Sequence, residues 1–202
     1  MAVRAEAGQK AVTARYGMWF FLYTEFILFG MLFLLYSVFR YRFPADFHAG
    51  AMEENILTGS VNTAVLLTSS LTMALAISAV KKGNNRLSAG LQLLTMALGI
   101  GFLCIKAYEW YVKIVKGLYP GSPVLLKMHP GEIIYFGLYY TMTGLHGLHL
   151  FAGVAVTAYM FYFTIKGRIS ADNCARLENT GLYWHFVDMV WMFLFPLFYL
   201  IT

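Results

Sequence analysis

Five long apolar stretches, separated by short polar segments, dominate this sequence of 202 residues. A helix needs about 20 apolar residues to cross the roughly 30 Å of hydrocarbon in a bilayer. The stretches lie at residues 16–39, 56–80, 87–112, 132–165 and 181–201. Because an α-helix satisfies its backbone hydrogen bonds internally, it is the element that such stretches form in lipid. The predicted fold class is therefore all-α, a polytopic membrane protein with a bundle of five transmembrane helices.

The composition agrees with this fold class. The chain is 59% hydrophobic and 12% charged, whereas soluble domains carry about 25% charged residues. The segments between the stretches are too short for a further domain, so residues 16–202 are expected to form one membrane domain. Residues 1–15 are basic and lack the compact apolar core of a removable signal peptide. We expect them to form a short cytoplasmic tail.

The distribution of Lys and Arg predicts the orientation in the membrane. Nine of these residues fall in the tail and in the second and fourth loops: Arg4, Lys10, Arg15, Lys81, Lys82, Arg86, Lys166, Arg168 and Arg176. Five fall on the other side: Arg40, Arg42, Lys113, Lys116 and Lys127. Since basic loops stay in the cytoplasm, the N-terminus is expected there and the C-terminus outside. The net charge of +5 is thus a feature of orientation and does not indicate nucleic-acid binding.

Sequence motifs exclude several classes of function. Cys104 and Cys174 lie in different settings, a helix and a loop, and indicate neither a disulfide framework nor a zinc site. Walker, HExxH, nucleophile-elbow and Gly-rich nucleotide motifs are absent from the sequence. The chain is therefore expected to carry no hydrolase or nucleotide chemistry of its own.

Ionisable residues inside the apolar stretches are the candidate functional residues. They are Glu25, Lys106 with Glu109, His146 with His149, and His185 with Asp188. A charged residue at bilayer depth costs roughly 2.5–3.5 kcal/mol on insertion scales, so each should point into the bundle or toward a partner. The last three sets are spaced i,i+3, which places both members on one helical face.

The fourth stretch carries two stripes that lipid would not favour. The first is polar and aromatic: Tyr135, Tyr139, Met142, His146, His149 and Gly153. The second is small: Gly137, Gly144 and Gly147. Because small residues permit close helix contacts and polar residues avoid lipid, we expect this helix to be central.

The residues leave several interpretations open. A haem would need one ligand from each of two helices, such as His149 and His185, and a non-haem metal would combine His146 and His149 with carboxylates. A proton relay would use Glu109, and a small transporter would use the same intramembrane charges. The plainest interpretation is a structural polar network in which His185 donates to Asp188.

Five segments then carry a resemblance to a known family: "RYGM…TE", "VNTAVLLTSS", "IKAYEW", "TGLHGLHLFAG" and "YWHFVDMVWMFLF". From about Arg15 to the C-terminus the chain resembles subunit III of haem–copper oxidases, the cytochrome c and quinol oxidases. It looks like the five-helix form, which lacks the first two helices of the seven-helix members. Those two helices make one wall of a lipid-filled cleft, so the resemblance leaves this cleft in doubt here.

The resemblance implies a subunit without catalytic residues, metal or other cofactor of its own. Haem and copper are expected in the partner subunits, mainly subunit I and also subunit II, in a bacterial inner membrane. Membrane lipids, a bound phospholipid and a respiratory supercomplex are further expected partners, and nucleic acid is not. The family is thought to support proton uptake and to keep the catalytic subunit durable.

The resemblance also assigns residues. Glu109 and Glu25 match membrane carboxylates of the family and are candidates for supporting proton uptake. Lys106, His146, His149, His185 and Asp188 are the candidate structural polar network. An accessory protein of nitric-oxide reductase, a five-helix relative, has similar motifs and is the alternative within the family.

Overall fold

The computed structural model describes residues 2–200, apart from the side chains of residues 2–12, 14 and 172. Its helices are α1 (Ala2–Arg42), α2 (Pro44–Met52), α3 (Ile56–Lys81), α4 (Asn85–Val115), α5 (Pro130–Ile165) and α6 (Ala175–Phe195). Two short 3₁₀ turns lie at Leu125–Lys127 and Ala171–Asn173, and a π-helical turn, η3 (Pro196–Leu200), follows α6. Five of these helices, all except α2, are long and apolar enough to cross a membrane. The prediction of an all-α bundle with five transmembrane helices is confirmed.

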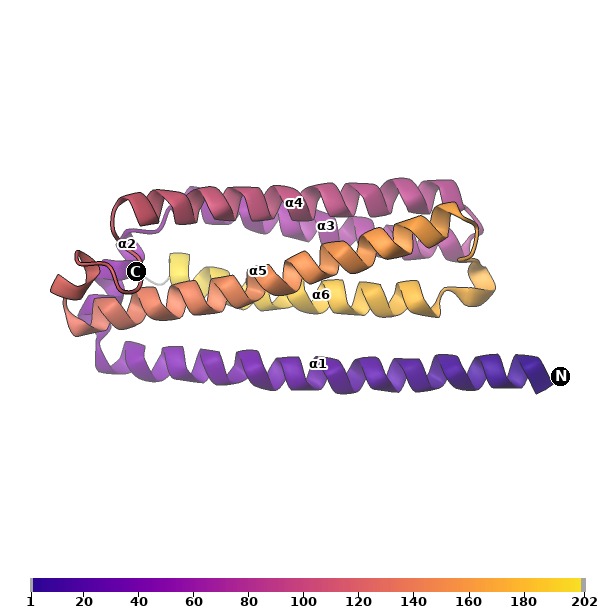
Figure 1. Cartoon of the computed structure of the whole chain (residues 1–202), viewed down its shortest axis with the longest axis horizontal. Coiled ribbons are helices and arrows are strands. Elements are labelled where there is room, and N and C mark those ends of the chain that lie inside the picture. The colour runs from indigo at the N-terminus through magenta and orange to yellow at the C-terminus, as the bar shows by residue number, and fades with distance from the viewer. Residues whose placement is uncertain (1, 201–202) are drawn as a thin grey trace.

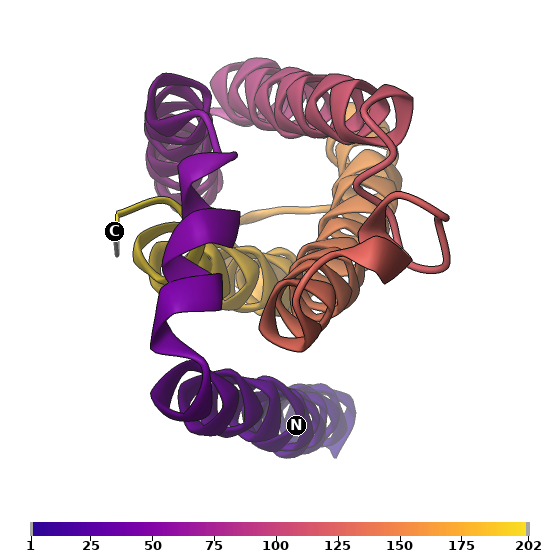
Figure 2. The ribbon, with the colours of Figure 1, turned by 90° about the vertical axis from the view of Figure 1, so that its left-hand side faces the viewer.

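The five long helices run along one axis (Figure 1). α3 and α4 lie side by side, joined by a tight turn at Gly83, whose φ of 77° favours glycine. α5 contacts α1, α2, α4 and α6, which agrees with the expectation that this helix is central. α1 lies along one side of the bundle, against α5 and α6 (Figure 2).

The N-terminal segment and the first loop both contain helical structure. α1 begins at Ala2, so residues 2–15, which we expected to form a tail before the first span, are helical and continuous with it. The tail residues Arg4 and Lys10 have side chains outside the described part of the chain. In the first loop, Pro44 is the first residue of α2, a helical position that favours proline. α2 crosses the end of the bundle from α1 toward α3 (Figure 2).

Close helix packing uses the predicted small stripe only at Gly144 and otherwise depends on other glycines. A Cβ added to Gly137 would meet no atom within 4 Å, and one at Gly147 only Leu103 at 4.0 Å. Gly144, the third member of this stripe, does make a close contact, because a Cβ there would lie 3.0 Å from the ring of Trp110 on α4. Gly99 and Gly153 instead contact the fully buried Trp184, whose ring would lie 2.9 and 3.2 Å from a Cβ at these positions. The indole fills the space between α4, α5 and α6.

Candidate functional site

The buried carboxylate of Glu109 is the centre of a polar cluster inside the bundle. Its Oε1 atom accepts from Lys106 Nζ at 3.0 Å, from the Tyr199 hydroxyl at 2.6 Å and from the Tyr139 hydroxyl. Lys106 also donates to both phenol oxygens, at 3.0 Å for Tyr139 and 2.5 Å for Tyr199. Lys106 and Glu109 are 5% and 7% exposed. The i,i+3 pair predicted to share a face thus forms a direct ion pair that reaches α5 and η3.

Two further charges extend this pair toward the end of the bundle. Lys113 Nζ lies 2.9 Å from Glu54 Oε2 and 3.5 Å from Glu109 Oε1. When Glu54 is ionised, the charges of Lys106, Glu109, Lys113 and Glu54 alternate in sign along this order and sum to zero. We call these four residues the ionic cluster. Charges so buried are stable only when paired and hydrogen-bonded, so losing one member is costly.

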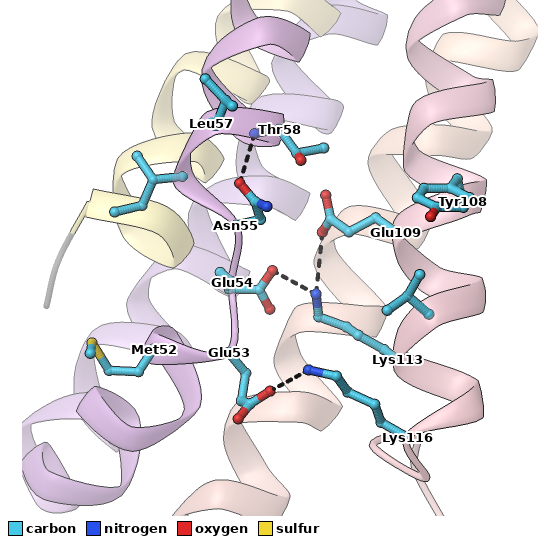
Figure 3. A pocket seen from close by; sticks show the side chains of 12 residues that line it. Met52, Glu53, Glu54, Asn55, Leu57, Thr58, Tyr108, Glu109, Lys113 and Lys116 are labelled. Atoms are coloured by element: carbon cyan, nitrogen blue, oxygen red, sulfur yellow. Dashed lines mark hydrogen bonds and ion pairs between the residues drawn. The ribbon is translucent and has the colours of Figure 1, made fainter.

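A pocket of about 790 Å³ opens beside the ionic cluster, between the α2–α3 connection and the C-terminal end of α4 (Figure 3). Glu54, Glu109 and Lys113 point toward one another from its two sides. A second ion pair, Lys116 with Glu53 at 3.0 Å, stands at its rim, and both side chains are about half exposed. The pocket therefore opens the ionic cluster to the outside of the bundle at the C-terminal end of α4.

Burial raises the pKa of the Glu54 carboxyl from 4.5 to about 7, although the Lys113 ammonium acts in the opposite direction. Between about pH 4.5 and 7 the folded protein then binds more protons at Glu54 than the unfolded chain. Stability from this group is present at low pH and falls as the pH rises through that window, by on the order of 1–3 kcal/mol. Glu54→Gln is expected to remove this part of the pH dependence.

The measurement is the unfolding midpoint of wild type and Glu54→Gln in mild detergent at pH 5.5 and pH 8. The matched control is Glu53→Gln, which changes the neighbouring, half-exposed carboxylate. Only Glu54→Gln should flatten the pH dependence. An unchanged slope in Glu54→Gln would show that Glu54 titrates alike in the folded and unfolded chain.

A second polar contact attaches α1 to α5. His149 Nε2 lies 2.9 Å from Glu25 Oε2, and His149 Nδ1 lies 2.8 Å from the Leu145 carbonyl oxygen. Since a carbonyl only accepts, Nδ1 carries a hydrogen, and one further proton must lie between Nε2 and the carboxylate. The pair is therefore neutral as a unit, which suits its place at membrane depth.

The expected hydrogen bond between His185 and Asp188 is not formed. His185 Nδ1 instead bonds the hydroxyl of Ser70 on α3 at 2.6 Å. The Asp188 carboxylate is buried, and neither of its oxygens has a hydrogen-bond partner, although Ser70 is its polar neighbour. The i,i+3 spacing places both residues on one helical face, but the imidazole bonds a hydroxyl on the facing helix instead of the carboxylate.

This geometry predicts different losses of stability for two substitutions. Ser70→Ala should destabilise the bundle by about 1–3 kcal/mol, because it leaves His185 without its partner. Asp188→Asn should cost less, since it removes no hydrogen bond and replaces a carboxylate by a neutral group. Unfolding in SDS, followed by circular dichroism, measures both. The assignment is contradicted when Asp188→Asn proves the more harmful of the two.

His146 is the remaining histidine of the predicted network. It is fully buried, both ring nitrogens lack partners, and its ring lies 5.6 Å from that of Phe102 and 5.3 Å from that of Trp191. It therefore packs as an aromatic side chain between α4 and α6. Within residues 2–200, wherever side chains are described, no group of three or more His, Cys, Asp or Glu side chains is placed to hold a metal ion.

Four residues of this site were not among the predicted ones: Glu54, Lys113, Tyr139 as a hydrogen-bond donor, and Tyr199. Lys113 had a visible signal, because positions 106, 109 and 113 follow the 3-4 spacing of one helical face. It lies one residue beyond the predicted stretch at residues 87–112, which therefore does not include it. Glu54 and Tyr199 have no local signal, since their partners lie far along the chain.

The fold and the site define a class, a polytopic membrane protein whose five long helices are joined by buried polar contacts. A profile of the cytochrome c oxidase subunit III family matches residues 5–202. The chain therefore belongs to this family, and the predicted resemblance to subunit III of haem–copper oxidases is confirmed.

Individual relatives agree with this assignment. The chain is 33% identical to the cytochrome c oxidase subunit 3 of Alkalihalophilus pseudofirmus, over 91% of this chain and 84% of that protein. It is 30% identical to the cytochrome bo(3) ubiquinol oxidase subunit 3 of Pseudomonas putida, over 97% and 88%. It is also 30% identical to a haem–copper oxidase subunit I+III of Aeropyrum pernix. This similarity covers 93% of this chain but only 22% of the length of that longer protein.

Proposed function

We propose that this chain is the non-catalytic subunit III of a bacterial respiratory terminal oxidase, in which other subunits reduce oxygen. The match of the family profile over residues 5–202 carries this proposal. In this proposal haem and copper belong to the partner subunits, and the chain binds subunit I and subunit II in the inner membrane. Its N-terminus is cytoplasmic, following the Lys and Arg distribution.

The relatives support the choice of partner. The Aeropyrum pernix relative has a name that joins subunits I and III in one protein, so the two parts of that protein are covalently connected. In this chain the same association would be non-covalent. The named relatives include both a cytochrome c oxidase and a ubiquinol oxidase, and the electron donor would be determined by the partner subunits.

The geometry supports a role in maintaining the oxidase. The ionic cluster joins the α2–α3 connection, α4, α5 and η3, and the Glu25–His149 pair joins α1 to α5. A bundle connected in this way offers a fixed surface against which subunit I is stabilised during turnover. Glu109 and Glu25 are the membrane carboxylates that would support proton uptake by the complex.

Deletion of the gene tests this function. We expect membranes of the deletion strain to keep a haem-bearing subunit but to lose oxygen consumption faster during sustained turnover, and the wild-type gene to restore the durability. Equal durability with and without the chain would reject the role. Loss of nitric-oxide reduction in place of oxygen consumption would assign the chain to the accessory protein of nitric-oxide reductase.

A further inference from the structure

One face of the bundle, formed by α3, α6 and α1, combines a polar atom with an apolar recess at membrane depth. α3 and α1 lie on opposite sides of α6 (Figure 2). Ser70 and His185 lie near the middle of their spans, Ile56–Lys81 and Ala175–Leu200. No member of the ionic cluster belongs to these three helices, and the function proposed above does not use this face.

His185 presents one ring nitrogen that the chain itself does not satisfy. Its Nδ1 atom is bonded to the Ser70 hydroxyl at 2.6 Å. The side chain is half-buried, and among the described side chains its Nε2 atom has no hydrogen-bond partner. Hydrocarbon offers no hydrogen bonds, so a polar atom open to lipid at this depth is costly. A protein group from outside this chain would remove the cost.

The neighbouring Asp188 indicates which kind of group Nε2 takes. Its buried carboxylate lies one helical turn from His185 and has Ser70 as its polar neighbour. Because a carboxylate only accepts, the Ser70 hydrogen is oriented toward it, and Ser70 Oγ accepts from the Nδ1–H group. The Nε2 atom then carries a lone pair, so it requires a hydrogen-bond donor.

An apolar recess lies next to this nitrogen, between α1 and α6. Its volume is about 170 Å³, and it is lined by four residues of α1, including Gly30, and four of α6, including Met189. Met189 is one turn from His185 on the same helical face and is 55% exposed. A Cβ added to Gly30 would meet none of the described atoms within 4 Å, so this glycine leaves the recess open. The recess therefore accepts an apolar side chain beside the polar contact.

A symmetric contact with a second copy does not fit this face. Two copies that lie parallel in a membrane and meet here would place His185 opposite His185 at the same depth. Both Nε2 atoms would then be acceptors, and neither would find a donor. A chain of different sequence is needed, and the function proposed above supplies one in subunit I.

We propose that the face of α3, α6 and α1 around His185 is the docking site of a transmembrane helix of subunit I, an inference that rests on the proposed function. An N–H or O–H group of that helix donates to His185 Nε2. A large apolar side chain one turn along the same helix fills the recess at Gly30. Met189 and Met192, both exposed, adapt their packing to that side chain.

Purification of the intact complex through a tag on this chain, in mild detergent, tests the docking site. The main variant is Gly30→Leu, which fills the recess at a position where an added Cβ meets no described atom within 4 Å. The matched control is Gly101→Leu on α4, where an added Cβ is equally unobstructed. His185→Leu removes Nε2 and is the second variant. The measured quantity is the amount of subunit I that co-elutes per chain, and circular dichroism of each sample checks the fold.

We expect Gly30→Leu and His185→Leu to retain at least about fivefold less subunit I than wild type, because each removes one contact with the partner helix. Gly101→Leu should stay close to wild type. His185→Gln keeps an acceptor and should fall between wild type and His185→Leu.

Three results would overturn the docking site while leaving the proposed function intact. They are full retention of subunit I in Gly30→Leu, an equal loss in Gly101→Leu, and a second copy of this chain on the face, released by Gly30→Leu. Wild type that elutes without a haem-bearing subunit would reject the proposed function, and this inference with it.

Discussion

Glu109→Gln is expected to destabilise the bundle by about 3–5 kcal/mol, because it leaves a buried charge uncompensated. Lys106 and Lys113 would then share the single negative charge of Glu54, although both are almost completely buried. Lys106 would lose its ion-pair partner at 3.0 Å. Unfolding in SDS, followed by circular dichroism, measures the loss.

Two variants separate this charge effect from general damage. Lys106→Met/Glu109→Gln removes one charge of each sign and leaves the Lys113–Glu54 pair balanced, so it should be more stable than Glu109→Gln alone. Glu53→Gln breaks the half-exposed pair with Lys116 and should cost at most about 1 kcal/mol. A double variant less stable than Glu109→Gln would show that charge balance does not maintain the ionic cluster.

Trp184→Ala should cost about 3–5 kcal/mol, because it leaves a cavity where three helices meet. The indole is 1% exposed, contacts the glycine positions Gly99 and Gly153, and donates from Nε1 to Ser69 Oγ at 3.1 Å. The Trp184 ring holds the two glycines apart, so Gly99 and Gly153 do not fill the space that the substitution leaves. The same SDS titration measures the effect.

Matched substitutions again identify the cause. Trp184→Phe keeps part of the volume and loses the hydrogen bond, so it should fall between wild type and Trp184→Ala. Trp19→Ala, in the exposed face of α1, removes the same side chain from a site with far fewer contacts. If Trp19→Ala proved as harmful as Trp184→Ala, the packing account of Trp184 would be wrong.

The transmembrane helices were predictable because lipid imposes a length and a composition on each of them. The first loop was harder to predict. The apolar stretch at residues 16–39 gives no sign that a second helix, α2, begins at Pro44 directly after α1 ends at Arg42. α2 is held by contacts with α5, including the Gly131 N–H donating to Asp46 Oδ2 at 3.1 Å. No local sequence pattern predicts such a contact.

The candidate site shows the same limit. Helical spacing identified Lys106 with Glu109 as neighbours, and the pair is direct. Spacing also suggested His185 with Asp188, but Ser70 on another helix bonds the imidazole instead. Two residues that share a face of one helix are able to contact each other. The facing helices decide which contact forms, and their register is a property of the whole bundle.

The measurement that tests the central claim most directly is purification through an affinity tag on this chain in mild detergent, with an optical spectrum and mass spectrometry of the same peak. The proposed function predicts a reduced haem spectrum and co-elution of a haem-bearing subunit I with subunit II. A colourless protein that elutes alone would contradict it.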